Sequence, residues 1–146
     1  MPDFAAIKAR QQQTWVQGDY MLVSADLVLV SELLCETADL RAGQKVLDVA
    51  TGSGNTALAA ARRRCDVIGV GHAPTLLALG QARTATERLP VTFRDGDAEQ
   101  LPFADATFDV VLPTFGVMFA PDQKQAARKL LRVWGPDIPA QSVLYL

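Results

Sequence analysis

Residues 46–57 read VLDVATGSGNTA, and this stretch does most to decide the fold class of the chain. It begins with a short apolar run that ends in turn residues, which predicts a strand buried on both faces, as in a parallel sheet. Gly52 and Gly54 would let the backbone turn sharply and approach a ligand closely. The helix predicted from Asn55 to about Arg64 would then point its N-terminal N–H groups at that ligand.

Asp48 stands inside the apolar run, four residues before Gly52. A carboxylate there needs a partner, because burying an unpaired charge is costly. Residues 52–57 also fit the G-x-G-x-x-G/A pattern of dinucleotide sites, but this pattern alone is a weak signal and does not require an acid near the end of the strand. A turn that binds nothing would leave Asp48 and both glycines without a purpose.

The composition is that of one globular domain. The chain has 146 residues, of which 49% are hydrophobic, and a formal net charge of −2, so it lacks the basic surface expected of a nucleic-acid-binding protein. One histidine and two widely separated cysteines provide neither a metal site nor a disulfide framework. The N-terminus does not resemble a signal peptide, and no apolar run approaches ~18–20 residues, so we expect a cytoplasmic protein without a membrane span.

Helix and strand patterns alternate along the chain. An apolar stripe of Val23, Leu27, Val30 and Leu34 predicts a helix over residues 21–38, and a stripe of Ala127, Leu130, Leu131 and Trp134 predicts another after Pro121. The remaining predicted helices cover residues 4–16 and 74–88, and the remaining strands cover residues 66–70, 91–94, 108–112 and 142–146. Such alternation implies right-handed crossovers and a parallel sheet covered on both faces.

Several local patterns resemble class I S-adenosylmethionine (SAM) methyltransferases of the ubiquinone/menaquinone-biosynthesis type. Residues 46–55 resemble the family's first motif, which is D-x-x-x-G-x-G after a hydrophobic strand. Residues 97–103 (DAEQLPF) are similar to its D-A-x-x-L-P-F segment. The leader at residues 7–20, the strand and exit loop at 108–119 and the LLRV sequence at 130–133 match in the same order. The resemblance implies an α/β, Rossmann-like parallel sheet sandwiched by helices, with an N-terminal helical segment and SAM as the cofactor.

We therefore predict a single domain over residues 1–146, made of N-terminal helices (1–40), a cofactor-binding core (41–134) and an atypical C-terminus (135–146). In the family, the first-motif acid lies near the ammonium of SAM, the glycine loop lies under the methionine part and the D-A pair lies near the adenine. The cofactor-binding residues implied for this chain are Asp48, Ala50, Gly52, Ser53, Gly54, Gly71, His72, Asp97, Ala98 and Thr114. Candidates for a substrate pocket are Trp15, Tyr20, Phe115, Met118 and Phe119. No catalytic residue is assigned, because the cofactor supplies the activated methyl group.

The chain departs from the family pattern in three places. Gly71 stands where the family usually has an acid that bonds both ribose hydroxyls, and the neighbouring His72 can make one such bond. Pro113 falls at the end of the fourth predicted strand, where it cannot donate to the ladder. Residues 134–146 (WGPDIPAQSVLYL) lack the turn and the later strands that are usual in the family, as in a truncated sequence.

Three functions remain open. A SAM-dependent methyltransferase acting on a small-molecule acceptor, at full or reduced activity, is the leading interpretation. A non-catalytic paralogue that acts by protein association is the second, favoured by Gly71 and the short C-terminus. A nicotinamide-dinucleotide protein is disfavoured by Asp48 and by the lack of an acid about twenty residues after the loop. The apolar residues 142–146 would leave a strand edge exposed, so we also expect self-association through them.

Overall fold

The computed structural model describes residues 1–17, 20–113 and 119–135. Within these ranges the strands form one parallel sheet in the order β3-β2-β1-β4. The strands are β1 (Lys45–Val49), β2 (Asp66–Gly71), β3 (Val91–Asp95) and β4 (Val110–Pro113). β1 lies between β2 and β4, and all three pairings are parallel. The structure therefore confirms the predicted α/β fold and the inner position of the first strand.

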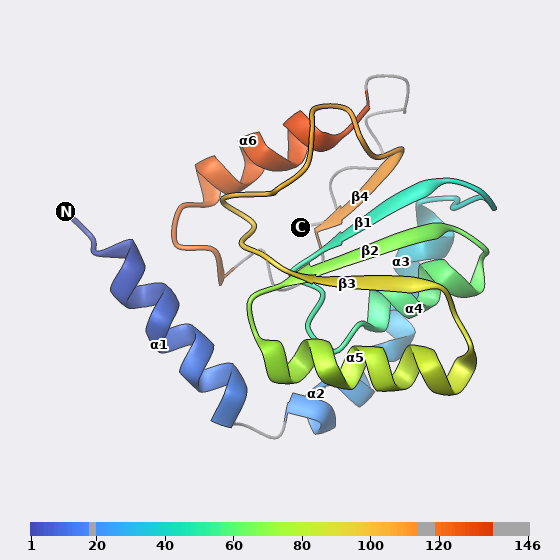
Figure 1. Ribbon diagram of the computed structural model, residues 1–146, viewed down its shortest axis with the longest axis horizontal. Coiled ribbons are helices and arrows are strands. Elements are labelled where there is room, and N and C mark those ends of the chain that lie inside the picture. Colours follow the sequence, from blue (N-terminus) through green and yellow to red (C-terminus); the bar gives the residue numbers. More distant parts are fainter. Residues whose placement is uncertain (18–19, 114–118, 136–146) are drawn as a thin grey trace.

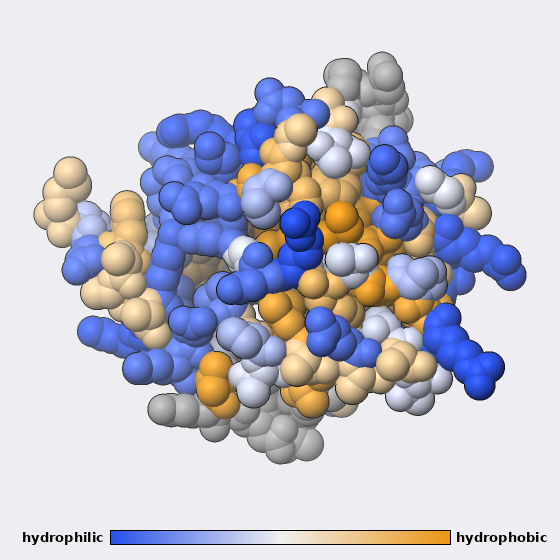
Figure 2. Space-filling view, in the orientation of Figure 1, coloured by the Kyte–Doolittle hydropathy of each residue, from blue (hydrophilic) through white to orange (hydrophobic). Residues whose placement is uncertain are grey.

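Helices cover both faces of the sheet. They are α1 (Phe4–Gln17), α2 (Tyr20–Asp26), α3 (Val28–Thr37), α4 (Asn55–Arg62), α5 (Pro74–Glu87) and α6 (Gln123–Val133). Figure 1 shows α4 and α5 on one side of the sheet, α6 on the other, and α1 beyond the edge at which the strands end. In the same orientation, Figure 2 shows hydrophilic residues gathered toward α1 and α6 and apolar residues at the centre of the view. No helix within the described ranges is long and apolar enough to cross a bilayer.

The helix that follows the glycine loop is buried almost all round. Every residue of α4 from 56 to 61 is buried, and four of them are alanines. Their small side chains let α4 fit between the sheet and the neighbouring helices at close range. Where α3 meets it, the buried residues of α3 are Ser31 and Cys35, which are also small.

The predicted helix over residues 21–38 is instead two helices, and two of the four residues of its predicted apolar stripe are exposed, whereas Leu27 is half-buried and Leu34 packs against the core. The chain breaks at Leu27, and Val23 and Val30 are 56% and 39% exposed. Buried in their place are Ser24 and Ser31, whose hydroxyls are hydrogen-bonded to Ser53 and Thr56. Close approach to α4 and hydrogen bonding therefore selected the buried face, which a hydropathy pattern does not register.

The apolar stripe predicted for α6 is also shifted. Ala126, Leu130 and Val133 are buried, whereas Ala127 is exposed and Leu131 is 55% exposed. Leu130 and the partly buried Trp134 were placed correctly, and the other two were not, because the sequence offers two adjacent apolar rows on this helix. After α6, Trp134 forms a parallel bridge with Phe108, just before β4.

Pro113 is the last residue of β4, where its missing N–H is tolerated. It lies in register with Val49 of β1. The strand predicted over residues 142–146 lies outside the described residues.

Candidate functional site

The glycine loop after β1 turns the chain sharply into α4. Ala50 (φ 57°), Gly52 (φ 56°) and Gly54 (φ 89°) have left-handed backbone conformations. Gly54 donates its N–H to the carbonyl oxygen of Thr51 at 2.8 Å. A Cβ at Gly54 would lie 2.9 Å from the Phe93 ring, so this position needs glycine for space as well as for conformation. Ala50 adopts the same region at a cost in free energy, an outlier of the kind found at ligand sites.

Asp48 is a fully buried carboxylate at the base of this loop. Its Oδ2 accepts a hydrogen bond from Thr51 Oγ1 at 2.6 Å and another from the backbone N–H of Ala57 at 3.1 Å. The N-terminal end of α4 also stabilises a negative charge. The partners that the sequence argument required are therefore supplied by the loop and the first turn of α4, and Asp48 ties β1 to both.

A cavity of about 500 Å³ lies at the carboxyl ends of the strands. The loops after β1, β2 and β3 contribute Gly52, His72 and Asp97 to its lining, and Gly71 at the end of β2 lines it as well. The remaining walls come from α1, α2, the start of α5 and residues 119–121. This is the edge of an open α/β sheet at which ligands bind, because the loops and helix N-termini face it.

The cavity brings together most of the predicted cofactor residues. Those that line it are Ala50, Gly52, Gly71, His72, Asp97 and Ala98. Asp48, Ser53 and Gly54 are not among the lining residues, and they fix the loop from behind. Thr114 lies outside the described residues.

Two of the predicted substrate-pocket residues, Trp15 and Phe119, line the cavity. Phe115, Met118 and the side chain of Tyr20 lie outside what the structure describes. The sequence analysis did not assign to the site six further residues that also line the cavity, which are Lys8, Gln12, Val23, Leu27, Leu76 and Leu77. The family-like leader over residues 7–20 was the available signal for the first two, but it did not show where α1 would lie.

β2 ends in the cavity without the acid that the family usually has. Gly71 pairs with Asp95 of β3, and a Cβ built on it would lie 3.3 Å from Leu77 Cδ2 and 3.5 Å from Thr51 Cγ2. A side chain at this position therefore needs only a small shift of its neighbours. Next to it, the imidazole Nε2 of His72 is buried and has no hydrogen-bond partner among the described residues. His72 lines the cavity beside the missing carboxylate, although this nitrogen itself has almost no exposed surface.

An ion cluster joins α1 to the loop after β3. Lys8 Nζ lies 2.6 Å from Asp97 Oδ2 and 2.5 Å from Glu99 Oε2. Burial alone would lower the pKa of Lys8, but the hydrogen bonds and charges of the two acids outweigh burial and raise its pKa. Glu99 is itself buried and accepts a hydrogen bond from the N–H of Asp122 at 2.9 Å. The cluster therefore links α1 to the residue that precedes α6.

Two side-chain hydrogen bonds and a ring contact also join α1 to this region. Gln11 Nε2 donates to the carbonyl oxygen of Phe119 at 2.9 Å, and Gln12 Nε2 donates to that of His72 at 2.6 Å. The rings of Trp15 and Phe119 meet edge to face with centroids 5.2 Å apart. No side chain over residues 4–16 is buried, so these contacts hold α1 as an outer wall of the cavity.

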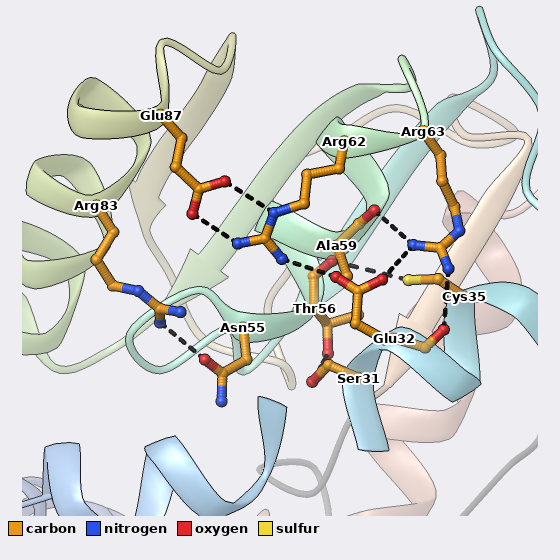
Figure 3. A network of polar contacts seen from close by, with 10 residues as sticks. All are labelled: Ser31, Glu32, Cys35, Asn55, Thr56, Ala59, Arg62, Arg63, Arg83 and Glu87. Carbon is orange, nitrogen blue, oxygen red and sulfur yellow. Dashed lines mark hydrogen bonds and ion pairs between the residues drawn. The ribbon is translucent and has the colours of Figure 1, made fainter. Parts of the chain in front are cut away.

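At the C-terminal end of α4, away from the glycine loop, an ion-pair network joins α3, α4 and α5 (Figure 3). Arg62 donates two hydrogen bonds to Glu87, at 2.8 and 2.6 Å, and one to Glu32 at 2.7 Å. Arg63 donates to the other oxygen of Glu32 at 2.6 Å. Arg62 holds the pKa of Glu87 below its ordinary value. Burial alone would raise the pKa of Glu32, but the hydrogen bonds from Arg63 and Arg62 outweigh burial and lower its pKa.

Comparison with known proteins agrees with the geometry of the site. Residues 46–137, from the second residue of β1 to beyond α6, match the model of the methyltransferase domain family. The chain therefore belongs to that family, and the predicted resemblance is confirmed.

Two relatives show how far the similarity extends. An uncharacterized protein of Mycobacterium tuberculosis is 40% identical over 131 residues, which cover 89% of this chain and 48% of that protein. Demethylmenaquinone methyltransferase of Thermus thermophilus is 35% identical over 122 residues, which cover 74% of this chain and 56% of that enzyme. The chain thus spans about half the length of the curated relatives it matches.

Solved structures share the fold. The YcgJ protein of Bacillus subtilis has a TM-score of 0.70 and 31% identity, over 74% of this chain and 47% of that chain. The [4+2]-cyclase SpnF has the same TM-score with 28% identity, over 75% of this chain and 42% of that chain.

Proposed function

We propose that this chain is a SAM-dependent methyltransferase domain that acts on a small-molecule acceptor. The observation that supports this best is the cavity at which the loops after β1, β2 and β3 converge, in a member of the methyltransferase family. Its volume of about 500 Å³ falls within the range of pockets for small ligands, roughly 300–1,000 Å³.

The residues of the cavity fit SAM. Gly52 and its loop would lie under the methionine part, as in the family, and Asp97 and Ala98 beside the adenine. His72 lines the cavity next to Gly71, and its imidazole would offer one hydrogen bond to the ribose once the ring turns toward the ligand, where Gly71 offers none. A single bond to an imidazole is weaker than two bonds to a carboxylate, so we expect weak binding.

The bound cofactor would supply a methyl group that is already activated for displacement, which leaves orientation to the protein. Part of the cavity wall is formed by the apolar side chains of Trp15, Val23, Leu27 and Phe119. These side chains would exclude water and hold an apolar part of the acceptor. The apolar character of this wall supports a small, largely apolar acceptor.

A role other than methyl transfer is the second candidate. The missing acid at Gly71 favours it, and so does the [4+2]-cyclase, which has this fold and is named for a different reaction. In that case the cavity would bind a ligand without passing on a methyl group.

Isothermal calorimetry with SAM, S-adenosylhomocysteine and NAD tests the proposal. We expect both sulfur ligands to bind and NAD not to bind. Radiolabelled SAM offered with small-molecule extracts should then label an organic-soluble product. Binding without labelling would support the second candidate, and binding of NAD alone, or of none of the three, would contradict the proposal.

A further inference from the structure

A second set of contacts fixes the glycine loop from outside the cavity lining. Arg83 of α5 donates from Nη1 to the carbonyl oxygen of Ser53 at 2.9 Å and to Asn55 Oδ1 at 2.8 Å. Ser53 Oγ lies 3.4 Å from the same nitrogen. Ser53 is 1% exposed, so its carbonyl oxygen needs a partner within the protein. Figure 3 shows Arg83 reaching from α5 to Asn55 at the start of α4.

The path of α5 brings Arg83 within reach of the loop. A Cβ built on Gly80 would lie 3.2 Å from the carbonyl oxygen of Ser53 and 2.8 Å from the ring of Phe93. Gly80 and Arg83 are three residues apart, and therefore lie on the same face of α5. Because Gly80 has no side chain, α5 can approach the loop closely, and the guanidinium of Arg83 then reaches the loop.

Asn55, which accepts a hydrogen bond from Arg83, also bonds α2. Its Nδ2 donates to the carbonyl oxygen of Ser24 at 2.7 Å, while the hydroxyls of Ser24 and Ser53 are 2.8 Å apart. The N-cap of α4 is Gly54, which has no side chain to cap the helix. The exit of the loop is therefore held by side chains from two other helices.

Arg83 makes these contacts with neutral oxygens. Burial lowers the pKa of Arg83, and the charge of Arg62 lowers it further. An arginine remains charged under these conditions, so its partial burial costs free energy that ion pairing does not fully offset. Arg62 differs, because its guanidinium bonds the carboxylates of Glu32 and Glu87.

We propose that Arg83 is a positioning residue for the cofactor loop. By holding Ser53 and Asn55, it keeps the loop in the shape that receives the cofactor. Arg83 is not among the residues that line the cavity, so it acts through the loop. The proposal rests on the proposed function for its effect on binding, and on the contacts alone for its effect on the loop.

The test compares Arg83→Met with Arg62→Met, which removes a neighbouring guanidinium that does not contact the loop. Amide hydrogen exchange is measured without ligand at Gly54 and Leu58, whose N–H groups bond Thr51 and Gly54, relative to the amides of β1. S-adenosylhomocysteine affinity is measured by calorimetry. Arg83→Met should speed exchange at the loop and weaken binding, each by about tenfold, which corresponds to one lost charge-assisted hydrogen bond. Arg83→Lys should recover part of both, and Arg62→Met should change neither.

Wild-type exchange and affinity in Arg83→Met would overturn the proposal, and so would equal loosening of the loop in Arg62→Met. A wild-type chain that binds no S-adenosylhomocysteine would refute the proposed function instead, and the exchange rates would still decide the role of Arg83. If Arg83→Met does not fold, Asn55→Ala removes the side-chain acceptor of Arg83 and Asn55→Asp keeps it, while both variants lose the bond from Nδ2 to Ser24. Faster exchange in Asn55→Ala than in Asn55→Asp would support the proposal, and equal exchange in the two would overturn it.

Discussion

The two walls of the cavity differ in how deeply their side chains are buried. On one side, α4 is buried over residues 56–61, and the fully buried Asp48 and the guanidinium of Arg83 fix the glycine loop. On the other side, α1 has no buried side chain over residues 4–16. Its contacts with the cavity region come from Lys8, Gln11, Gln12 and Trp15.

The two walls therefore differ in how freely their side chains can change. Side chains in the buried wall cannot change without leaving voids or unpaired polar groups, so this wall suits a ligand part that never varies, such as a cofactor. The contacts of Gln11 and Gln12 are exposed, and only Lys8 among the contact residues of α1 described above pairs with a buried acid, Glu99. Apart from Lys8, this wall can therefore change at little cost to the fold. We therefore expect the identity of the acceptor to be set mainly from α1.

The largest effect should come from Asp48→Ala. This change leaves two buried donors, Thr51 Oγ1 and the N–H of Ala57, without their acceptor. Each unsatisfied donor costs about 1–3 kcal/mol, so the free energy of unfolding should fall by about 3 kcal/mol or more. Urea denaturation measures it. Asp48→Asn is the matched control, because both donors bond the same oxygen and an amide oxygen can replace it; equal losses in the two variants would contradict this account.

Gly71→Asp should strengthen SAM binding. The new carboxylate would restore the missing acceptor for the ribose, in a place where a Cβ meets no atom closer than 3.3 Å. A charge-assisted hydrogen bond contributes about 1.5–3 kcal/mol, which is about ten- to a hundredfold in affinity. Calorimetry on the two chains measures it, with Gly71→Asn as the uncharged control. Equal dissociation constants for Gly71→Asp and the wild type would show that Gly71 does not limit binding.

Arg62→Met should remove part of the acid sensitivity of the fold. The pKa values of Glu32 and Glu87 are lowered from 4.5 in the folded state, so their contribution to stability is present above pH 4.5 and is lost as the pH falls below it. The variant should lose about 1 kcal/mol at neutral pH, since partly exposed ion pairs are screened. Its stability should then fall less steeply below pH 4.5. Urea denaturation midpoints of the variant and the wild type, measured from about pH 3 to about pH 7, test this. Parallel curves for the two proteins would exclude the ion-pair network as a cause of the acid sensitivity.

Trp15→Ala should affect stability least. Trp15 is only partly buried, and its edge-to-face contact with Phe119 is the kind of aromatic pair that contributes about 0.5–1.5 kcal/mol. We expect a loss of about 1 kcal/mol or less in the free energy of unfolding, together with altered acceptor use. For comparison, Leu58→Ala in the buried wall should cost about 2–5 kcal/mol. A loss of that size for Trp15→Ala would mean that α1 is part of the stable core.

Self-association through residues 142–146 stays a prediction, because these residues lie outside the described ranges. Their side chains are uncharged and mostly apolar, which suits pairing with another chain. Light scattering over a concentration series should show oligomers that disappear when residues after Trp134 are deleted. A stable monomer that this deletion does not change would contradict it.

Local sequence patterns were sufficient for the sheet and for most of the cavity. The strand, the two glycines and Asp48 all act within a dozen residues, so residues 46–57 predicted their own conformation and the position of the site. The break at Leu27 and the buried face of α3 were not predictable in this way, because they depend on hydrogen bonds to α4 and the loop. The wall formed by α1 depends on pairs such as Gln12 with His72 and Gln11 with Phe119, which are 60 and 108 residues apart in the chain.

The central claim is that the cofactor binds at the carboxyl edge of the sheet, against the buried wall. Amide chemical shifts measured during a titration with S-adenosylhomocysteine test it most directly. The account predicts the largest shifts at Gly52, Gly71, Asp97 and Ala98, with little change in α3 and α6. Saturable shifts centred on α3 or α6, or no shifts at all, would contradict it.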